Sequence, residues 1–240
     1  NTLIQGGGGC RYGYYGELEE KILRDLGYKF EFYNMISDNH ISLKKGYRFC
    51  KKINKKTNLF MCGYYLFNSL LMIIFIDKIE KYLRLNMGFE VEKGSFEELE
   101  KKYFNSFKNN GVFKNIYLYC KYKRKFKKIA IDKPKDHLRV AILGELYSLI
   151  DDNTSYNTER KLIKMGIEVY RDTDLTYFLI TKRFKLVRMI KKGKKYIKYH
   201  LGADASGTIV KSLDVAKKGF DGILHLKSFG CTPEISAMSI

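Results

Sequence analysis

The sequence predicts an α/β protein built around parallel sheets, and three observations indicate this class. Short apolar segments with strand character alternate with helical segments near both ends of the chain, at 2–35 and at 137–240. Glycine or a helix-capping residue stands at several of the junctions between them. The 240 residues, 45% of them hydrophobic, suffice for one large core or two modest ones. Strands and helices that alternate at this spacing form βαβ units, in which the strands run parallel.

The first strand, helix and strand occupy 2–35. Residues 2–5 have the apolar character of a buried strand, and the glycines that follow form a loop. The segment 14–27 predicts a helix that stops at Gly27, and 28–35 alternates between apolar and polar residues as a strand does. The apolar stripe of this helix consists of Leu18, Ile22, Leu23 and Leu26.

The middle of the chain, about 36–128, is rich in Lys, Asn, Tyr and Phe and carries no motif of known chemistry. Helical patterns occur at 59–85 and 95–109. The apolar stretch at 60–76 contains Asn68, has lysines on both sides and is shorter than the roughly 20 residues that a spanning helix needs. We therefore expect a buried core helix here and no membrane segment.

The chain changes character at Pro134, after which strands and helices alternate again. The expected elements are a strand from 137, a helix at 158–166, a strand at 167–173, a Lys-rich helical region to about 199, a helix at 206–220 started by Ser206 and stopped by Gly219, a strand at 221–230 and a helix with Thr232 as N-cap and Pro233 as its first residue. We predict one α/β lobe with a helical insertion at 1–130 and a second lobe at 131–240. Because the chain begins without methionine and ends in the first turns of a helix, we expect both ends to continue in a longer protein.

The composition is basic, with 45 Lys and Arg against 26 Asp and Glu, a net charge of +19. The basic clusters at 51–56, 121–128 and 191–195 are separated by apolar segments, so we expect a solvated lysine-rich surface rather than a dedicated nucleic-acid face. No secretory signal pattern is present, and the five cysteines are odd in number without CxxC spacing. These features disfavour classical zinc modules and thioredoxin-like sites, and they predict a reducing, cytoplasmic location.

The glycine-rich loop GGGGCRYGYYG at 6–16 does not fit a nucleotide-binding fingerprint. The pattern GxGxxG fails from each possible start, and the phosphate-loop pattern GxxxxGK, begun at Gly8, has Tyr14 where the lysine should stand. Nucleotide binding at this loop is therefore disfavoured.

The same loop contains Cys10, which resembles Cys231 in its setting. Each cysteine follows a predicted strand and precedes a predicted helix, so both belong at the carboxyl ends of parallel strands, where α/β sheets bind ligands. Backbone amides stabilise a metal-bound thiolate, and the bare backbone at Gly8, Gly9 and Gly230 offers such amides beside each thiol. The alternative interpretation is two buried cysteines beside tight turns. The remaining cysteines, for which we expect a structural role, are Cys50, Cys62 and Cys120.

Two further polar groups follow predicted strands or precede helices. The loop HLGADASGT is either an N-cap loop or a site that orients an acyl or phosphate group, and its polar residues are His200, Asp204, Ser206 and Thr208. Glu145, with Tyr147 nearby, ends the strand that begins near 137, and capping of the next turn is more common there than general-base chemistry. Neither a Ser/His/Asp order nor an HExxH motif is present, so hydrolase chemistry has no direct support.

Three blocks of the sequence together resemble the 2-hydroxyglutaryl-CoA dehydratase D-component superfamily. They are GGGGCRYGYYGELEEKILRDLGYKFEF, RVAILGELYSLIDDNTSYNTERKLIKMGIEVYRDT and HLGADASGTIVKSLDVAKKGFDGILHLKSFGCTPEI, which cover about half of the chain. The resemblance is greatest to the activase-related branch, whose members are acyl-CoA dehydratase activase-related proteins and kin of the double-cubane cluster proteins.

This resemblance implies two Rossmann-like lobes that hold an iron–sulfur cluster between them, either [4Fe–4S] or a double cubane. It implies that Cys10 and Cys231 are cluster ligands and that a further cysteine lies before Asn1, so the cluster site is incomplete in this chain. The implied partners are an ATP-dependent activator domain or subunit, which delivers a low-potential electron, and an acyl-CoA. Whether the chain is itself an enzyme of the lyase or reductase type stays open. The alternative function is a non-enzymatic basic α/β interaction module that binds RNA.

Overall fold

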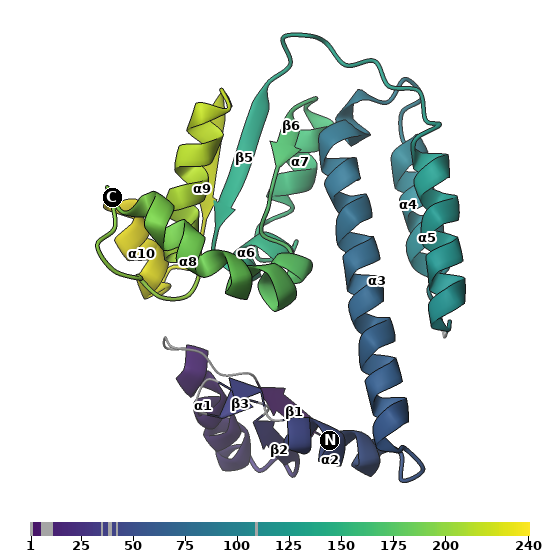
Figure 1. The fold of residues 1–240 in the computed structure, drawn as a ribbon, viewed down its shortest axis with the longest axis vertical. Coiled ribbons are helices and arrows are strands. Elements are labelled where there is room, and N and C mark those ends of the chain that lie inside the picture. The colour runs from purple at the N-terminus through teal and green to yellow at the C-terminus, as the bar shows by residue number, and fades with distance from the viewer. Residues whose placement is uncertain (1, 6–11, 35, 38–39, 42, 109) are drawn as a thin grey trace. The chain divides into compact units, whose positions relative to one another are not determined.

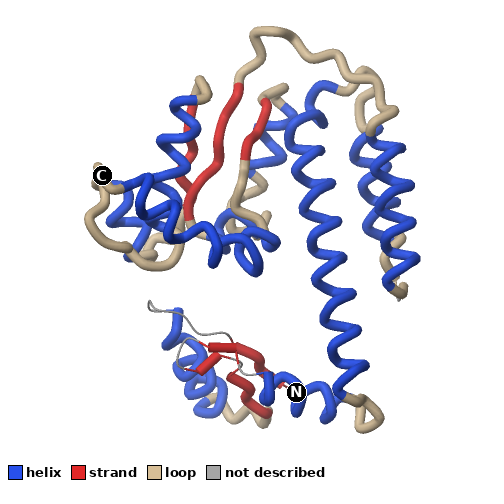
Figure 2. Tube along the Cα trace, in the orientation of Figure 1, coloured by secondary structure: helices blue, strands red, loops and turns tan. Residues whose placement is uncertain are grey.

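Helices alternate with short parallel strands in the computed structural model, which describes residues 2–5, 12–34, 36–37, 40–41, 43–108 and 110–240 (Figures 1 and 2). The α/β class predicted from the sequence is confirmed at this level. The chain divides into two compact units, 1–67 and 68–240, and the boundary falls inside helix α3. The lobes at 1–130 and 131–240 stay a prediction.

The strands are β1 (Thr2–Gln5), β2 (Glu31–Asn34), β3 (Ile36–Ser37), β4 (His40–Ile41), β5 (Arg139–Gly144), β6 (Glu168–Tyr170) and β7 (Gly222–Leu226). The α-helices are α1 (Tyr12–Asp25), α2 (Leu43–Ile53), α3 (Leu59–Asn86), α4 (Ser95–Asn105), α5 (Val112–Phe126), α6 (Leu146–Ile150), α7 (Thr158–Lys164), α8 (Lys182–Gly193), α9 (Ala205–Lys217) and α10 (Thr232–Met238). Two short helical segments, η1 (Met87–Phe89) and η2 (Tyr177–Thr181), follow α3 and precede α8.

The first unit contains the predicted strand, helix and strand. β1 pairs with β2 in parallel, with Thr2 opposite Glu31, and α1 connects them. The stripe predicted on α1 is only partly buried within the described residues, since Leu18 and Ile22 keep 43% and 48% of their surface exposed. β3 and β4 form a two-residue antiparallel pair.

The second unit is organised around a three-stranded parallel sheet in the order β6-β5-β7. Side chains alternate across the central strand β5, as its pleat requires. Ala141 and Leu143 pack with Val215 of α9, whereas Ile142 on the opposite face joins the cluster formed with α3. Both faces of β5 are therefore covered, which is typical of parallel sheets (Figure 1).

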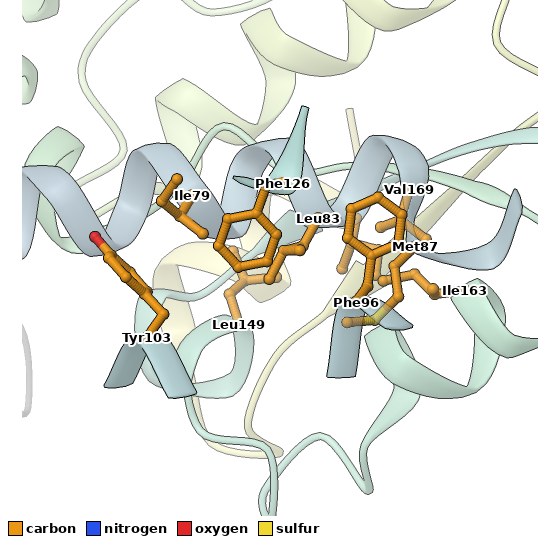
Figure 3. Close-up of a cluster of buried hydrophobic side chains, with 10 residues drawn as sticks. Ile79, Leu83, Met87, Phe96, Tyr103, Phe126, Leu149, Ile163 and Val169 are labelled. Carbon is orange, nitrogen blue, oxygen red and sulfur yellow. The ribbon is translucent and has the colours of Figure 1, made fainter. Parts of the chain in front are cut away.

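The main core of this unit brings α3, α4 and α5 against α7 and β6 (Figure 3). The rings of Phe96 and Phe126 stack with centroids 6.2 Å apart. The buried members are Ile79, Leu83, Met87, Phe96, Tyr103, Phe126, Ile142, Leu149, Ile163 and Val169. Each fully buried aliphatic or aromatic side chain contributes about 1.5–3 kcal/mol relative to an exposed one, so this cluster is the main source of stability.

Helix α3 matches the helical pattern predicted at 59–85, but only its second half is a core helix. Ile79 and Leu83 are buried, whereas Phe60 is 84% exposed. By length and composition the segment Leu59–Phe89 is apolar enough to cross a membrane, and 17% of its apolar window is buried. The burial of the second half in the Figure 3 cluster supports the core-helix interpretation for that part.

The N-terminal boundaries of α9 and α10 differ from the predictions, because other residues are their N-caps. The N-cap of α10 is Cys231 rather than Thr232, and Pro233 occupies the second helical position, where its missing N–H is still harmless. The N-cap of α9 is Asp204, so this helix begins ahead of the predicted Ser206. Helices α2, α5 and α6 were not predicted.

Candidate functional site

The carboxyl edge of the β6-β5-β7 sheet is formed by the ends of three parallel strands. Gly144 ends β5, Arg171 follows β6, and Leu226 ends β7. A Cβ on Gly144 would lie 1.9 Å from the Leu226 carbonyl oxygen, and the residue has φ +134°. Only glycine fits this close approach of β5 to β7, so the edge is tightly fixed.

Of the predicted ligand residues, Gly8, Gly9 and Cys10 lie outside the described residues. Cys231 is half-buried and stands between β7 and α10, as the sequence predicted. Its backbone N–H donates to the Ser228 carbonyl oxygen at 3.2 Å. A Cβ on Gly230 would meet no atom within 4 Å, so the backbone beside the thiol is open.

The described residues do not assemble a metal site by themselves. Within them, no group of three or more His, Cys, Asp or Glu side chains is placed to hold a metal ion.

The cysteines expected to be structural have different surroundings. Cys50 of α2 and Cys62 of α3 lie with their Sγ atoms 3.4 Å apart, and burial raises the pKa of the Cys50 thiol. Cys120 is exposed on α5. The contact between Cys50 and Cys62 was not predicted, because two cysteines twelve residues apart match no motif.

Glu145 caps α6, as the more common interpretation of its position predicted. Its carboxylate accepts the backbone N–H groups of Tyr147 and Ser148, both at 3.0 Å, and the Ser148 hydroxyl at 2.7 Å. These bonds satisfy amides of the first turn of the helix. The Glu145 carboxylate is therefore engaged in capping.

The loop before α9 is held together by its own polar side chains. His200 Nδ1 lies 2.9 Å from the Ser206 hydroxyl, which also accepts the Leu201 backbone N–H at 3.0 Å. The Lys182 ammonium donates to the Asp204 carboxylate at 2.7 Å. These contacts involve three of the four polar residues that the sequence singled out. They connect the loop to itself and to Lys182, and the N-cap residue Asp204 makes no side-chain hydrogen bond to the amides of α9.

Thr208, the fourth of these residues, belongs to a buried hydrogen-bonded group that was not predicted from the sequence. Its hydroxyl donates to one oxygen of Glu234 at 3.1 Å, and His225 Nε2 lies 2.7 Å from the other. Glu234 is fully buried, and burial raises the pKa of its carboxyl group. We call Thr208, His225 and Glu234 the Glu234 cluster. Its members come from α9, β7 and α10, and no local motif connects them.

Lys211 of α9 contacts the segment that follows β6 and has an unusual environment for a lysine. Its ammonium donates to the Thr173 hydroxyl at 2.8 Å and lies 3.7 Å from the centre of the Tyr177 ring. Burial lowers the pKa of Lys211 to about 8. A lysine with this pKa is partly neutral under mildly alkaline conditions, so it combines nucleophilic and basic character.

No protein-family model matches this sequence, and neither the curated proteins nor the solved structures gave a match. The resemblance to the dehydratase superfamily therefore stays a prediction.

Proposed function

We propose that the chain is an iron–sulfur cluster-binding component related to the 2-hydroxyacyl-CoA dehydratases and their activators. In this proposal, Cys10 and Cys231 are thiolate ligands of a [4Fe–4S] or double-cubane cluster, and the cluster takes part in low-potential electron transfer. The proposal includes two Rossmann-like lobes that hold the cluster. The observation that carries it is the position of Cys231, a half-buried thiol on the carboxyl side of a parallel strand.

The surroundings of Cys231 suit a bound sulfur. The open space beside Gly230 lets a bulky group approach the backbone closely, and amides near a cluster thiolate tune its reduction potential. Thiolate is the donor that iron–sulfur clusters use, commonly four cysteines to a cluster. Cys231 supplies one of these donors, so Cys10 and further thiolates from outside the described residues have to complete the site.

The partners follow from the same proposal. An ATP-dependent activator domain or subunit would supply the electron, because the sequence contains no nucleotide-binding fingerprint of its own. An acyl-CoA is the proposed substrate of the system.

Iron binding by cysteine variants tests this proposal. The longest natural form of the protein is purified anaerobically, reconstituted with iron and sulfide, and assayed for both elements and for a thiolate-to-iron absorption band at about 400 nm. We expect Cys10→Ala and Cys231→Ala each to lose most of the iron and the band. Cys120→Ala, which removes an exposed thiol from α5, is the matched control and should retain both. Equal iron content in all four proteins would contradict the proposal.

The alternative function, RNA binding by a basic module, is favoured by the surface of α5. Lys121, Lys123 and Lys125 are exposed, and each ammonium lies 5.5–5.8 Å from the centre of a tyrosine ring. In the described part of the chain, none of these three lysines forms an ion pair with a carboxylate. Cations beside aromatic rings are suited to phosphates and stacked bases.

Salt-dependent binding distinguishes this alternative. The affinity of single-stranded RNA for the iron-free chain is measured at several salt concentrations. RNA binding is supported if this affinity falls steeply with salt and if a variant with all three lysines changed to Gln binds much more weakly. Unchanged affinity of the triple variant would exclude α5 as the RNA-binding surface.

A further inference from the structure

A cavity of about 110 Å³ lies between α3, α6, α7 and the segment after β6 in the second unit. It is on the carboxyl side of β6, since Arg171 directly follows that strand. We call it the guanidinium cavity because three arginines, Arg84, Arg160 and Arg171, contribute to its lining. The other lining residues are Ile76, Asp77, Glu80, Leu83, Ile150, Asp152, Glu159, Ile163, Asp174 and Leu175.

Arg84, one of the lining residues, has an unused hydrogen-bonding edge. Its side chain is 2% exposed, and its Nε and Nη2 atoms have no hydrogen-bond partner. These two nitrogens form one edge of the planar guanidinium, with two parallel N–H bonds whose geometry matches the two oxygens of a carboxylate. Buried donors without partners are rare in folded proteins, because leaving them unpaired is costly.

The other polar groups hold this edge in position. Arg84 Nη1 lies 3.5 Å from Glu80 and 3.7 Å from Glu159. Arg171 contacts the same two carboxylates, at 3.6 Å and 2.9 Å, and donates to the Leu149 carbonyl oxygen. The 2.9 Å contact joins Arg171 Nε to Glu159 Oε2 without hydrogen-bond alignment, so both of those atoms also lack a hydrogen-bond partner. The cavity thus has an unsatisfied acceptor as well as unsatisfied donors.

The charges around the cavity determine which ligand fits it. Five lining carboxylates face three guanidiniums, and Arg160 is paired with Glu100, outside the lining. A multiply charged anion such as phosphate would be repelled by this excess of negative charge. A ligand that brings its own cation beside its carboxylate would satisfy both the Arg84 edge and the Glu159 oxygen.

The size and lining of the cavity restrict the class of ligand further. A cavity of about 150 Å³ admits benzene, so the cavity of about 110 Å³ suits a smaller molecule. Apolar side chains, including Leu83 and Ile163 of the core in Figure 3, complete the lining and suit a small aliphatic group. Asp152 and Leu175 are the exposed members of the lining, which leaves access from solvent on their side.

We propose that the guanidinium cavity binds a small α-amino acid as its zwitterion, of the size of glycine or alanine. The carboxylate lies on the Nε and Nη2 edge of Arg84, and the ammonium group donates to Glu159 and the neighbouring carboxylates. This site is separate from the proposed cluster, because Cys231 is not part of the lining.

Calorimetric titration of the full chain tests the ligand class. Glycine and L-alanine are compared with acetate and propionate, which lack the ammonium group, with ethylamine, which lacks the carboxylate, and with phosphate. We expect an amino acid to bind at least about ten-fold more tightly than each of the others, because each analogue leaves a buried charged group unpaired. No binding of glycine or alanine at about 10 mM would overturn the proposal, and so would acetate or phosphate binding as tightly as the amino acids.

Three variants test the assigned residues. Arg84→Lys keeps the charge but removes the two-pronged edge, and Glu159→Gln keeps the shape but removes the acceptor charge; each should weaken binding at least about ten-fold. Arg124→Lys, an exposed arginine on α5 outside the lining, is the matched control and should bind as the wild type does. Unfolding curves without ligand establish that each variant is folded. Wild-type affinity in folded Arg84→Lys and Glu159→Gln proteins would contradict the site.

Discussion

The second unit has two buried polar groups on the carboxyl side of its sheet, and they differ in how completely their atoms are paired. In the Glu234 cluster, beyond β7, both carboxylate oxygens have partners at 3.1 Å or less. In the guanidinium cavity, beyond β6, Arg84 is equally inaccessible, yet two of its nitrogens are unpaired. Burial alone therefore does not separate a structural polar group from a binding site, whereas the state of its hydrogen bonds does.

This difference between the two groups matters because a buried polar atom without a hydrogen bond costs free energy. A buried network in which each member is satisfied makes the fold rigid and specific. A buried donor that lacks a partner loses the free energy of its hydration without compensation, and a ligand can restore it. We therefore expect changes in the Glu234 cluster to affect stability alone, and changes at Arg84 to affect mainly ligand binding.

The largest effect that tests this comparison is expected at Arg171. Arg171 makes the shortest ion pair between two lining residues and a hydrogen bond to the Leu149 carbonyl oxygen, so it carries the structural part of the network. Arg171→Met should lower the free energy of unfolding by about 3–5 kcal/mol, because it removes a buried cation from two partly buried carboxylates and leaves the Leu149 carbonyl oxygen without its donor. Urea denaturation measures this.

Arg84→Met is the matched control for Arg171→Met. Arg84 lies 3.5 Å from Glu80 and 3.7 Å from Glu159, so it has no contact as short as the 2.9 Å pair of Arg171, and two of its three nitrogens have no hydrogen-bond partner. We expect its loss to cost at least about 1 kcal/mol less than the loss of Arg171. A greater cost at Arg84 would show that the open edge is structural and would break the comparison.

Lys211 of α9 provides an effect of intermediate size that depends on pH. Its pKa is about 8 in the folded protein and near 10.5 in the unfolded chain, so between these values the unfolded chain binds more protons. Stability contributed by this residue therefore rises as pH increases from 8 to 10.5.

The matching variant is Lys211→Met. The difference in free energy of unfolding between wild type and Lys211→Met should shift in favour of wild type over this pH range, by up to about 3 kcal/mol. Denaturation at several pH values measures the difference and cancels the titration of the other lysines. A difference independent of pH would show that the Lys211 ammonium is not desolvated.

Local patterns predicted much of the fold because they act over a few residues. Glycine stops, apolar periodicity and short β-rich runs located β1, α1, β5, α7, α9 and β7 to within a few residues. The capping role of Glu145 was also predictable, because its partners are two and three residues away. Helix α5 was missed because lysine and tyrosine dominate it and obscure the stripe of Asn115, Leu118 and Phe126.

The polar clusters could not be predicted because their partners are far apart in the sequence. Arg84 and Arg171 meet across α3 and the segment after β6, and Glu159 reaches both from α7. Nothing near these residues in the sequence separates them from solvated surface charges. The same holds for His225 and Glu234, whose pairing depends on α10 returning across the end of β7.

The smallest effect on stability is expected at Glu234, and it tests the cluster whose hydrogen bonds are all made. Glu234→Gln keeps the shape of the side chain, so its carbonyl oxygen still accepts the Thr208 hydroxyl while its amide faces His225. The charge that strengthens both hydrogen bonds is lost, and we expect the free energy of unfolding to fall by about 1 kcal/mol. Because both oxygens of Glu234 are already paired, the substitution should leave the affinity for glycine or alanine unchanged. Calorimetry and denaturation on the same preparation measure both quantities. Loss of amino-acid binding without loss of stability in Glu234→Gln would reverse the roles of the two clusters, since the closed network would then be the one that a ligand completes.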